Sequence, residues 1–292
     1  MDKKTTFADK RKFEFRRCLG SGGFGEVYLA KMISASGVES DVAVKILRKG
    51  ADPVSQSLRR LRDEGRLLGM LNHPAILRVI DLVLLEGQIA LVTEYLQGCD
   101  LSRCFKKGPM PHRILVEVIG QVADAMHAAY NTPSPDGEIL KLIHRDIKPA
   151  NIWIGLHGNV KLLDFGIARA NLKREAKTET NMLIGSYVYM APERFANDVL
   201  DLPGDVYSLG CTLYKGLSGR LFLHGMDLRR QYLLAQDAER YARHLEERLD
   251  ALPKVPEPVF ELVESMLAFD PANRPLTAEL ARRCEELAEE LE

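Results

Sequence analysis

One short stretch constrains this chain more than any other part: residues 144–151 read HRDIKPAN, and residues 164–166 follow as DFG. The first run carries Asp146 and Asn151, and the triplet adds Asp164. One aspartate can accept a proton from a hydroxyl group, while the other aspartate and the asparagine offer oxygen ligands to Mg²⁺. Eight such residues in a fixed order, followed by a second aspartate that can bind a metal, are hard to produce by chance. The pattern predicts transfer of a phosphoryl group from a metal-bound nucleotide.

Composition excludes several classes of protein. The chain has 292 residues, of which 46% are hydrophobic and 28% charged, which is ordinary for a globular protein with one large or two smaller cores. A net charge of −1 argues against nucleic acid as a partner, and charges interrupt every apolar run before it reaches the length of a membrane segment. Residues 1–12 lack the apolar centre of a signal peptide. Five dispersed cysteines without a C-x-x-C pair favour free thiols in a reducing cytoplasm.

The first third of the chain reads as strands with one helix among them. Asp52 and Pro53 are good N-cap and N1 residues, and the helix they begin should end near Leu71, before a His-Pro pair. Segments rich in β-branched and aromatic residues, separated by glycine or serine turns, predict strands at 12–19, 26–33, 41–47, 76–85 and 88–96. We therefore expect a small, mostly antiparallel sheet with a helix packed on it.

After residue 98 the pattern becomes helical. Apolar residues recur at helical spacing, and the predicted helices are 111–130, 204–217, 227–252, 258–267 and 277–291. A short hairpin is expected between them, from strands at 151–154 and 159–163. The whole chain is therefore predicted to be of the α+β class.

A glycine-rich segment lies between the first two predicted strands. Residues 20–27 read GSGGFGEV, and glycines allow positive φ and a close approach of the backbone to phosphate oxygens. Taken alone, such a segment is as often an ordinary hairpin turn. The following residues continue as a strand, which argues against a dinucleotide-binding unit that needs a helix there. The residues expected to cover the nucleotide phosphates are Gly20, Ser21, Gly22, Gly23, Phe24 and Gly25.

Lys45 is a charged residue at the end of an apolar strand, so its ammonium group needs either a partner or a path to solvent. On the predicted helix, Glu64 shares a face with Leu61 and Leu68, and a carboxylate between two inward leucines requires a partner. Lys45 is the natural candidate, and the pair would hold its ammonium group toward the α- and β-phosphates. Two alternatives remain: a lysine that extends to solvent, and Asp63 as the acidic partner.

These motifs together resemble those of protein kinases, and most of all the eukaryotic-like serine/threonine protein kinases of bacteria. The likeness runs from about residue 13 to about residue 275. It implies a bilobal kinase fold, with a five-stranded antiparallel N-lobe and its αC helix at 13–97 and a mainly helical C-lobe at 98–292. The catalytic domain would span 13–285, after an N-terminal extension at 1–12. The implied activity is ATP-dependent transfer of the γ-phosphoryl group to serine and threonine hydroxyls of proteins, with Mg²⁺ or Mn²⁺.

The resemblance assigns a role to each matching residue of the catalytic segment. Asp146 corresponds to the catalytic base, and Asn151 and Asp164 correspond to the metal ligands. Lys148 resembles the lysine that serine/threonine kinases place on the γ-phosphate, which argues against a tyrosine kinase. The residues expected around adenine are Val27, Ala43, Thr93 as a small gatekeeper, Glu94, Leu96 and Trp153, where the family usually has a leucine or methionine.

Other matches concern architecture and control. Glu193, in an Ala-Pro-Glu motif, is expected to form a buried ion pair with Arg274, and Asp205 to hold the backbone of the catalytic loop. Arg145 resembles the arginine that pairs with a phosphorylated activation loop. The residues expected to become autophosphorylated are Thr180 and, secondarily, Thr178. The alternative is a solvated polar loop without a switch.

Two other functions share part of this pattern with an active protein kinase. A kinase-fold scaffold without catalysis would be favoured by loss of Lys45, Asp146 or Asp164, and none is lost. A small-molecule phosphotransferase would share the base and the metal ligands but generally lacks the Ala-Pro-Glu motif, which this chain keeps. The chain could be the cytoplasmic catalytic part of a longer protein. Related bacterial kinases can form homodimers, and the sequence leaves this open.

Overall fold

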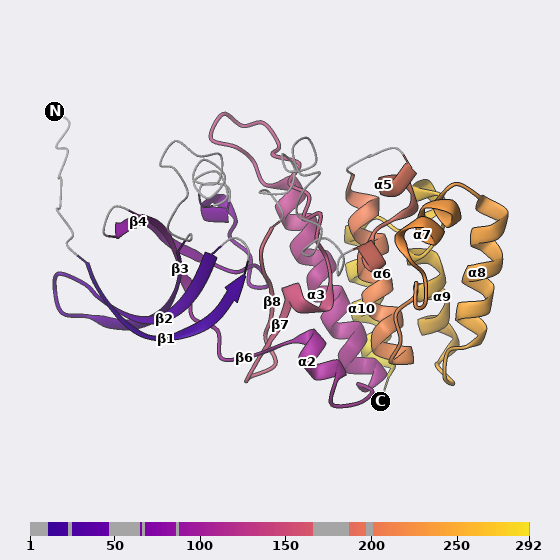
Figure 1. The fold of residues 1–292 in the computed structure, drawn as a ribbon, viewed down its shortest axis with the longest axis horizontal. Helices are drawn as coiled ribbons and strands as arrows, with labels where there is room; N and C mark the ends of the chain where they lie inside the picture. The colour runs from indigo at the N-terminus through magenta and orange to yellow at the C-terminus, as the bar shows by residue number, and fades with distance from the viewer. Residues whose placement is uncertain are drawn as a thin grey trace. The chain divides into compact units, whose positions relative to one another are not determined.

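The computed structural model describes residues 11–22, 25–46, 65, 68–85, 88–165, 187–196 and 201–291. The chain forms two compact units, one of residues 1–69 and 78–96 and the other of residues 70–77 and 97–292. In Figure 1 the strands of the first unit are indigo and purple, and helices α3 to α10 of the second run from magenta to yellow.

The first unit contains the predicted five-stranded antiparallel sheet, in the order β1-β2-β3-β5-β4. Its strands are β1 (Lys12–Gly22), β2 (Gly25–Ile33), β3 (Glu39–Ile46), β4 (Val79–Leu85) and β5 (Gln88–Glu94). Alternate residues of three neighbouring strands form a core on one face, namely Ala30, Val42, Val44, Ala90 and Val92, all fully buried.

The end of the predicted helix packs against this sheet. Residue 65 and residues 68–70 are helical, close to the predicted end at Leu71, and Leu68 is buried. A Cβ atom added to Gly65 would lie 3.1 Å from a methyl carbon of Leu91 and 3.4 Å from one of Leu82. The absence of a side chain at Gly65 therefore lets the helix come close to β4 and β5. The predicted start of this helix, at Asp52, lies outside the described residues.

The second unit is mainly helical. Its longest helix, α3, lies against α10, where a Cβ atom on Gly120 would come within 2.8 Å of the Cβ atom of Cys284. The helices are α2 (Leu101–Phe105), α3 (His112–Asn131), α5 (Pro192–Ala196), α6 (Leu202–Ser218), α7 (Leu228–Ala235), α8 (Ala238–Asp250), α9 (Glu257–Met266) and α10 (Thr277–Glu290), with 3-10 turns η1 (Pro149–Asn151), η4 (Tyr187–Tyr189) and η5 (Pro271–Asn273). A small sheet has the order β6 (Gly98–Asp100), β7 (Ile152–Gly155) and β8 (Val160–Leu162), and β7 and β8 form the predicted hairpin.

One helix prediction was wrong. The segment 227–252 was expected to be a single helix, but the structure has α7 and α8 with a break between them. The carboxylate of Asp237 accepts a hydrogen bond from the backbone N–H of Arg240 at 2.9 Å and so begins a new helix. An aspartate N-cap inside a continuous apolar pattern is therefore the cause of the break.

Residues 70–77 belong to the second unit, although the residues on both sides of them belong to the first. This segment lies along β8, where the N–H of Leu162 donates to the carbonyl oxygen of Ala75 at 2.7 Å. The N–H of Leu77 in turn donates to the carbonyl oxygen of Leu162 at 3.1 Å. His73 adds a contact of 2.9 Å from its Nε2 to the carboxylate of Asp124 on α3.

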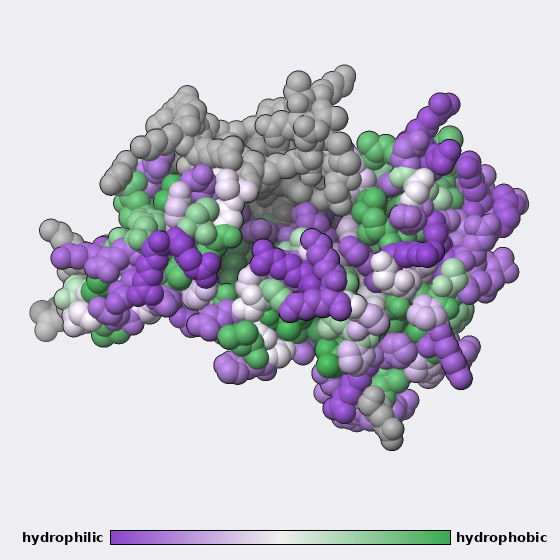
Figure 2. Space-filling view, turned by 60° about the horizontal axis from the view of Figure 1, so that its bottom comes forward, coloured by the Kyte–Doolittle hydropathy of each residue, from purple (hydrophilic) through white to green (hydrophobic). Residues whose placement is uncertain are grey.

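Part of the surface is strongly hydrophilic, in agreement with the many charged residues of the sequence. In Figure 2 the end of the second unit that carries α7 and α8 is covered mostly by hydrophilic residues, shown in purple. Within the described parts of the chain, no helix is both long enough and apolar enough to span a membrane.

Candidate active site

The catalytic segment folds back on itself around Asp146. Lys148 donates from Nζ to Oδ2 of Asp146 at 2.8 Å, and Asn151 donates from Nδ2 to the same oxygen at 3.0 Å. The same Nδ2 also reaches the carbonyl oxygen of Asp146 at 2.8 Å. The structure thus brings together three of the predicted residues, and the side chain of Asp146 keeps 10% of its surface exposed.

His144 is a structural residue with a fixed tautomer. Burial lowers the pKa of His144, so that its imidazole is neutral at physiological pH. Its Nε2 lies 2.8 Å from the carbonyl oxygen of Leu163, which can only accept, and its Nδ1 lies 3.3 Å from the backbone N–H of Asp146, which can only donate. The proton is therefore on Nε2. The ring also packs on Phe165, with centroids 4.8 Å apart, and so connects the loop of Asp146 to the Asp-Phe-Gly segment.

Asp205, in the first turn of α6, holds the backbone before Asp146. Its Oδ2 accepts from the N–H of His144 at 2.7 Å, and its Oδ1 accepts from the N–H of Arg145 at 3.0 Å. Asp205 is completely buried. Arg145 has a φ of 68°, in the left-handed region that costs a non-glycine residue energy. The two hydrogen bonds offset this cost and keep the turn in place.

Sequence reasoning missed the partner of Asp205. Arg194 on α5 donates from Nη2 to Oδ1 of Asp205 at 2.8 Å and to the carbonyl oxygen of Asp201 at 2.9 Å. Both charged side chains are buried, so the arginine neutralises a carboxylate that water cannot reach. A Cβ atom on Gly204 would lie 2.5 Å from Nε of Arg194, so only glycine leaves room for it. No periodic pattern marks this pair, because its members lie on different helices.

The predicted ion pair between Glu193 and Arg274 is present. It is bidentate, with N–O distances of 2.7 and 2.9 Å, and Nε of Arg274 donates to the carbonyl oxygen of Ala268 at 2.8 Å. The guanidinium is completely buried and all of its nitrogens donate. Such a fully satisfied pair fastens α5 to the segment after η5.

The residues expected to bind metal have suitable donor atoms. The amide nitrogen of Asn151 is committed to Asp146, which leaves its Oδ1 as the atom able to bind a cation. Asp164 is exposed and has a φ of 50°. Among the described residues only three non-glycine residues have positive φ, and Asp164 and Arg145 are two of them. A carboxylate and an amide oxygen fit a hard divalent cation, and strained backbone often marks functional sites.

In the first unit, the sheet register gathers residues expected to bind the nucleotide. Val27 lies opposite Lys45, and Ala43 lies opposite Thr93. Residues directly opposite in an antiparallel sheet, and alternate residues along a strand, share a face. Val27, Ala43, Lys45 and Thr93 therefore lie on one face, opposite the apolar core. Of the other predicted residues, Gly20, Ser21 and Gly22 are in β1, Gly25 is in β2, Glu94 ends β5 and Leu96 follows it.

Five predicted residues lie outside the described part of the chain: Gly23, Phe24, Glu64, Thr178 and Thr180. The glycine hairpin is described on both sides of Gly23 and Phe24, where Gly22 pairs with Gly25. The N–H of Glu94 donates to the carbonyl oxygen of Arg78 at 3.0 Å. This hydrogen bond holds the last residue of β5 beside the residue that precedes β4.

Trp153 lies in β7, opposite Asp100 of β6. A Cβ atom on Gly98 would lie 2.9 Å from its Nε1, so the indole packs directly over this glycine. No hydrogen-bond acceptor among the described residues reaches the buried Nε1.

Nucleotide binding is expected to change the fluorescence of Trp153, because we expect the indole to contact adenine and it is the only tryptophan of the chain. Titration with ADP should shift or quench the emission in a saturable manner. Free N-acetyltryptophanamide titrated with the same ADP is the control for inner-filter effects, and the Trp153→Phe variant shows the tyrosine emission alone. Unchanged emission at saturating ADP would place Trp153 outside the adenine site.

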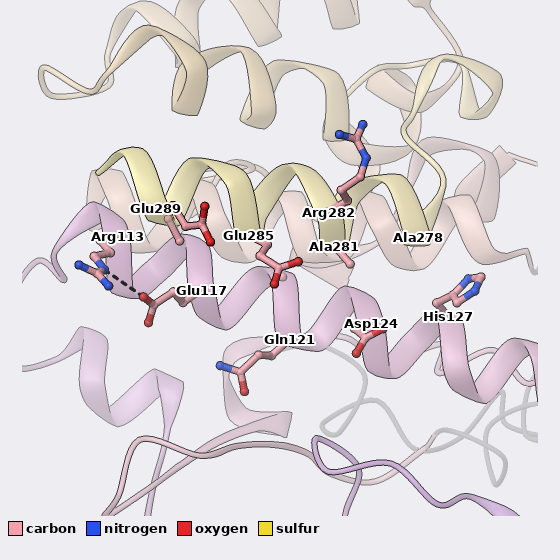
Figure 3. A pocket seen from close by; sticks show the side chains of 12 residues that line it. Arg113, Glu117, Gln121, Asp124, His127, Ala278, Ala281, Arg282, Glu285 and Glu289 are labelled. Atoms are coloured by element: carbon pink, nitrogen blue, oxygen red, sulfur yellow. Dashed lines mark hydrogen bonds and ion pairs between the residues drawn. The ribbon is translucent and has the colours of Figure 1, made fainter. Parts of the chain in front are cut away.

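A groove of about 550 Å³ lies elsewhere on the second unit, between α3 and α10. Figure 3 shows that its side chains come from these two helices, and half of the lining residues are charged. Arg113 and Glu117 are paired at 3.0 Å. None of the predicted site residues lines it.

Comparison with known proteins agrees with this geometry. The chain matches the family model described as "Protein kinase domain" over residues 13–284. It therefore belongs to the protein kinase family, whose members use ATP and a divalent metal ion.

Three curated relatives are similar over most of the chain. It is 34% identical over 269 residues to the tyrosine-protein kinase MasK of Myxococcus xanthus, 37% over 213 residues to the serine/threonine-protein kinase PknB of Mycobacterium leprae, and 31% over 274 residues to the serine/threonine-protein kinase PrkC of Bacillus subtilis. These matches cover 90%, 71% and 92% of this chain. They cover only 41%, 32% and 39% of the relatives, so the chain spans less than half of their length.

Proposed function

We propose that this chain is the catalytic domain of an ATP-dependent serine/threonine protein kinase that acts in the cytoplasm. The observation that carries the proposal is the shared hydrogen bonding of Lys148 and Asn151 to one oxygen of Asp146. This arrangement holds the carboxylate of Asp146 in a fixed orientation, as a base for a substrate hydroxyl requires.

Each residue has one task in the proposed reaction. Asp146 accepts the proton of the attacking hydroxyl, and Lys148 offers its ammonium group to the γ-phosphate. Asn151 and Asp164 would hold Mg²⁺, or Mn²⁺ in its place. Bound Mg-ATP supplies the γ-phosphoryl group and the charge neutralisation that its transfer needs. Lys45 would orient the α- and β-phosphates, with Glu64 as the partner that the sequence predicts for it.

Hydroxyl specificity is the point on which the relatives differ, since MasK is named a tyrosine-protein kinase and PknB and PrkC are named serine/threonine-protein kinases. Lys148, two residues after the base, favours serine and threonine. Its direct contact with Asp146 supports this assignment because the contact puts a cation beside the carboxylate that would accept the proton of the hydroxyl.

The same domain is proposed to phosphorylate its own activation loop at Thr180 and, secondarily, at Thr178. A phosphothreonine would find a partner in Arg145, because the buried Nε of this arginine has no hydrogen-bond acceptor among the described residues.

Incubation with [γ-³²P]ATP, Mg²⁺ and a general protein substrate should label protein on serine and threonine. Phosphoamino acid analysis reads the specificity, and peptide mapping should find phosphate on Thr180 and Thr178. The Asp146→Asn variant is the control for contaminating kinases. Label on tyrosine alone would contradict the hydroxyl specificity, and label on small metabolites but not on protein would favour a small-molecule phosphotransferase. The absence of all labelling would favour a scaffold.

A further inference from the structure

Two of the five cysteines face each other in the second unit. The sulfur atoms of Cys99 and Cys104 are 3.5 Å apart and share a hydrogen bond. Both residues are partly exposed, so that small solutes can reach them. The other cysteines differ, because Cys211 and Cys284 are buried and Cys18 is exposed. We propose that Cys99 and Cys104 form an oxidation site, at which a peroxide converts the two thiols into an intramolecular disulfide.

Local structure explains why the two side chains meet. Asp100 is the N-cap of α2, and its Oδ1 accepts from the backbone N–H of Arg103 at 3.0 Å. Cys99 precedes this cap, and Cys104 is the fourth residue of the helix. Residues at these two positions normally pack together as an apolar contact that fixes the entry of the chain into a helix. Here both positions hold thiols, so the fold itself keeps the two sulfur atoms close.

Formation of the disulfide requires only a small movement of the two sulfur atoms. A disulfide has a sulfur–sulfur distance of about 2.05 Å, so the atoms must approach by about 1.5 Å. Rotation of the two side chains can provide this, because neither is fully packed. The turn between the two residues is closed by the Asp100 cap and does not need to unfold.

The chemistry balances with hydrogen peroxide as the oxidant. The thiolate of Cys99 attacks one peroxide oxygen, the O–O bond breaks, and a sulfenic acid forms while hydroxide leaves and is protonated to water. The sulfur of Cys104 then attacks the sulfur of Cys99, the S–O bond breaks, and the proton of Cys104 goes to the leaving hydroxide. In total, two thiols lose two electrons and two protons, and the peroxide becomes two molecules of water.

The order of the two steps follows from the environment of Cys104. Burial and the hydrogen bond to Cys99 raise the pKa of Cys104, which disfavours the thiolate that a first attack on peroxide needs. Cys104 is therefore assigned the second, resolving step, and Cys99 the first attack.

The disulfide has a route to the catalytic segment. Cys99 pairs with Ile154 across β6 and β7, and β7 begins directly after Asn151. A bond that draws β6 toward α2 therefore acts on the strand next to a proposed metal ligand. This consequence rests on the proposed function. Because small displacements of catalytic groups are costly, we expect oxidation to lower kcat about tenfold.

Peptide mapping tests the site without any reference to activity. Trypsin cleaves after Arg103, between the two cysteines, so a disulfide must appear as a covalent link between peptides 79–103 and 104–106. After treatment of the full chain with a small excess of hydrogen peroxide, this linked pair should dominate and should disappear with dithiothreitol. Cys99→Ser and Cys104→Ser should abolish it, while Cys18→Ser, which removes the exposed lone thiol, should leave it unchanged.

Two results would overturn the proposal. One is over-oxidation of Cys99 without any linked peptide, which would mean that the thiols cannot reach each other. The other is a disulfide through Cys18 between two molecules in its place. Kinase assays on the same samples test the consequence separately: oxidised wild type should lose activity and regain it with dithiothreitol, whereas Cys104→Ser should not respond to this cycle. A linked peptide with unchanged kcat would contradict the effect on catalysis and leave the oxidation site intact.

Discussion

Replacement of Asp146 by asparagine is expected to lower kcat by about 10²–10⁴-fold, the range that general base catalysis usually contributes. The amide has nearly the shape of the carboxylate, so the loop should keep its fold, but it cannot take up the proton of the attacking hydroxyl. It also removes the negative charge that Lys148 and Asn151 contact at 2.8 and 3.0 Å. Steady-state kinetics with Mg-ATP and a protein substrate measures the loss.

The structure offers a matched control for this experiment. Asp136 lies exposed in the loop after α3, and Asp136→Asn makes the same chemical change on the surface, outside the catalytic segment. It should leave kcat within about twofold of wild type, as a substitution away from the reacting groups does. The thermal midpoint of both variants should match wild type. A nearly normal kcat in Asp146→Asn would remove Asp146 from its proposed role.

Replacement of Asp205 by asparagine should both destabilise the protein and inactivate it. Removal of one partner leaves the buried guanidinium of Arg194 without a counter-charge, which costs about 3–5 kcal/mol for a buried pair. The amide also cannot accept from two backbone N–H groups and the guanidinium together, so the turn at Arg145 loses support. Urea unfolding followed by circular dichroism measures the change in the free energy of unfolding.

An exposed ion pair provides the comparison. Arg282 and Glu286 pair one turn apart on α10 with more than half of each side chain exposed. Arg282→Met should therefore change the free energy of unfolding by less than about 1 kcal/mol. If Asp205→Asn costs no more than Arg282→Met, the buried pair does not hold the catalytic loop.

The sequence predicted the local features of this fold and missed the non-local ones. The sheet of the first unit and the helices α3, α6, α9 and α10 follow from apolar periodicity, which depends only on neighbouring residues. The break at Asp237 was missed because an apolar period continues across it, while one capping hydrogen bond decides the outcome. The strand β6 and the helix α2 were missed because they are shorter than the window in which a period can be recognised.

The residues of the candidate site likewise divide into a local group and pairs that lie far apart in the sequence. Asp146, Lys148 and Asn151 lie within six residues, so their spacing alone predicted a common site. The ion pair of Glu193 with Arg274 spans 81 residues, and it was predicted only through the family resemblance. The pairing of Arg194 with Asp205 had no such precedent in the sequence and depends on the space left by Gly204. The neutral tautomer of His144 could be assigned only once its two hydrogen-bond partners were known.

The position of residues 70–77 determines whether the second unit can be produced without the first. A truncated protein that starts at residue 97 would lack this segment, and the N–H and C=O of the fully buried Leu162 would both lose their partners. Unsatisfied backbone groups on an uncovered strand edge invite aggregation. The second unit is therefore not a module that a single cut before residue 97 could release. Any shortened version of it must keep residues 70–77 together with β8.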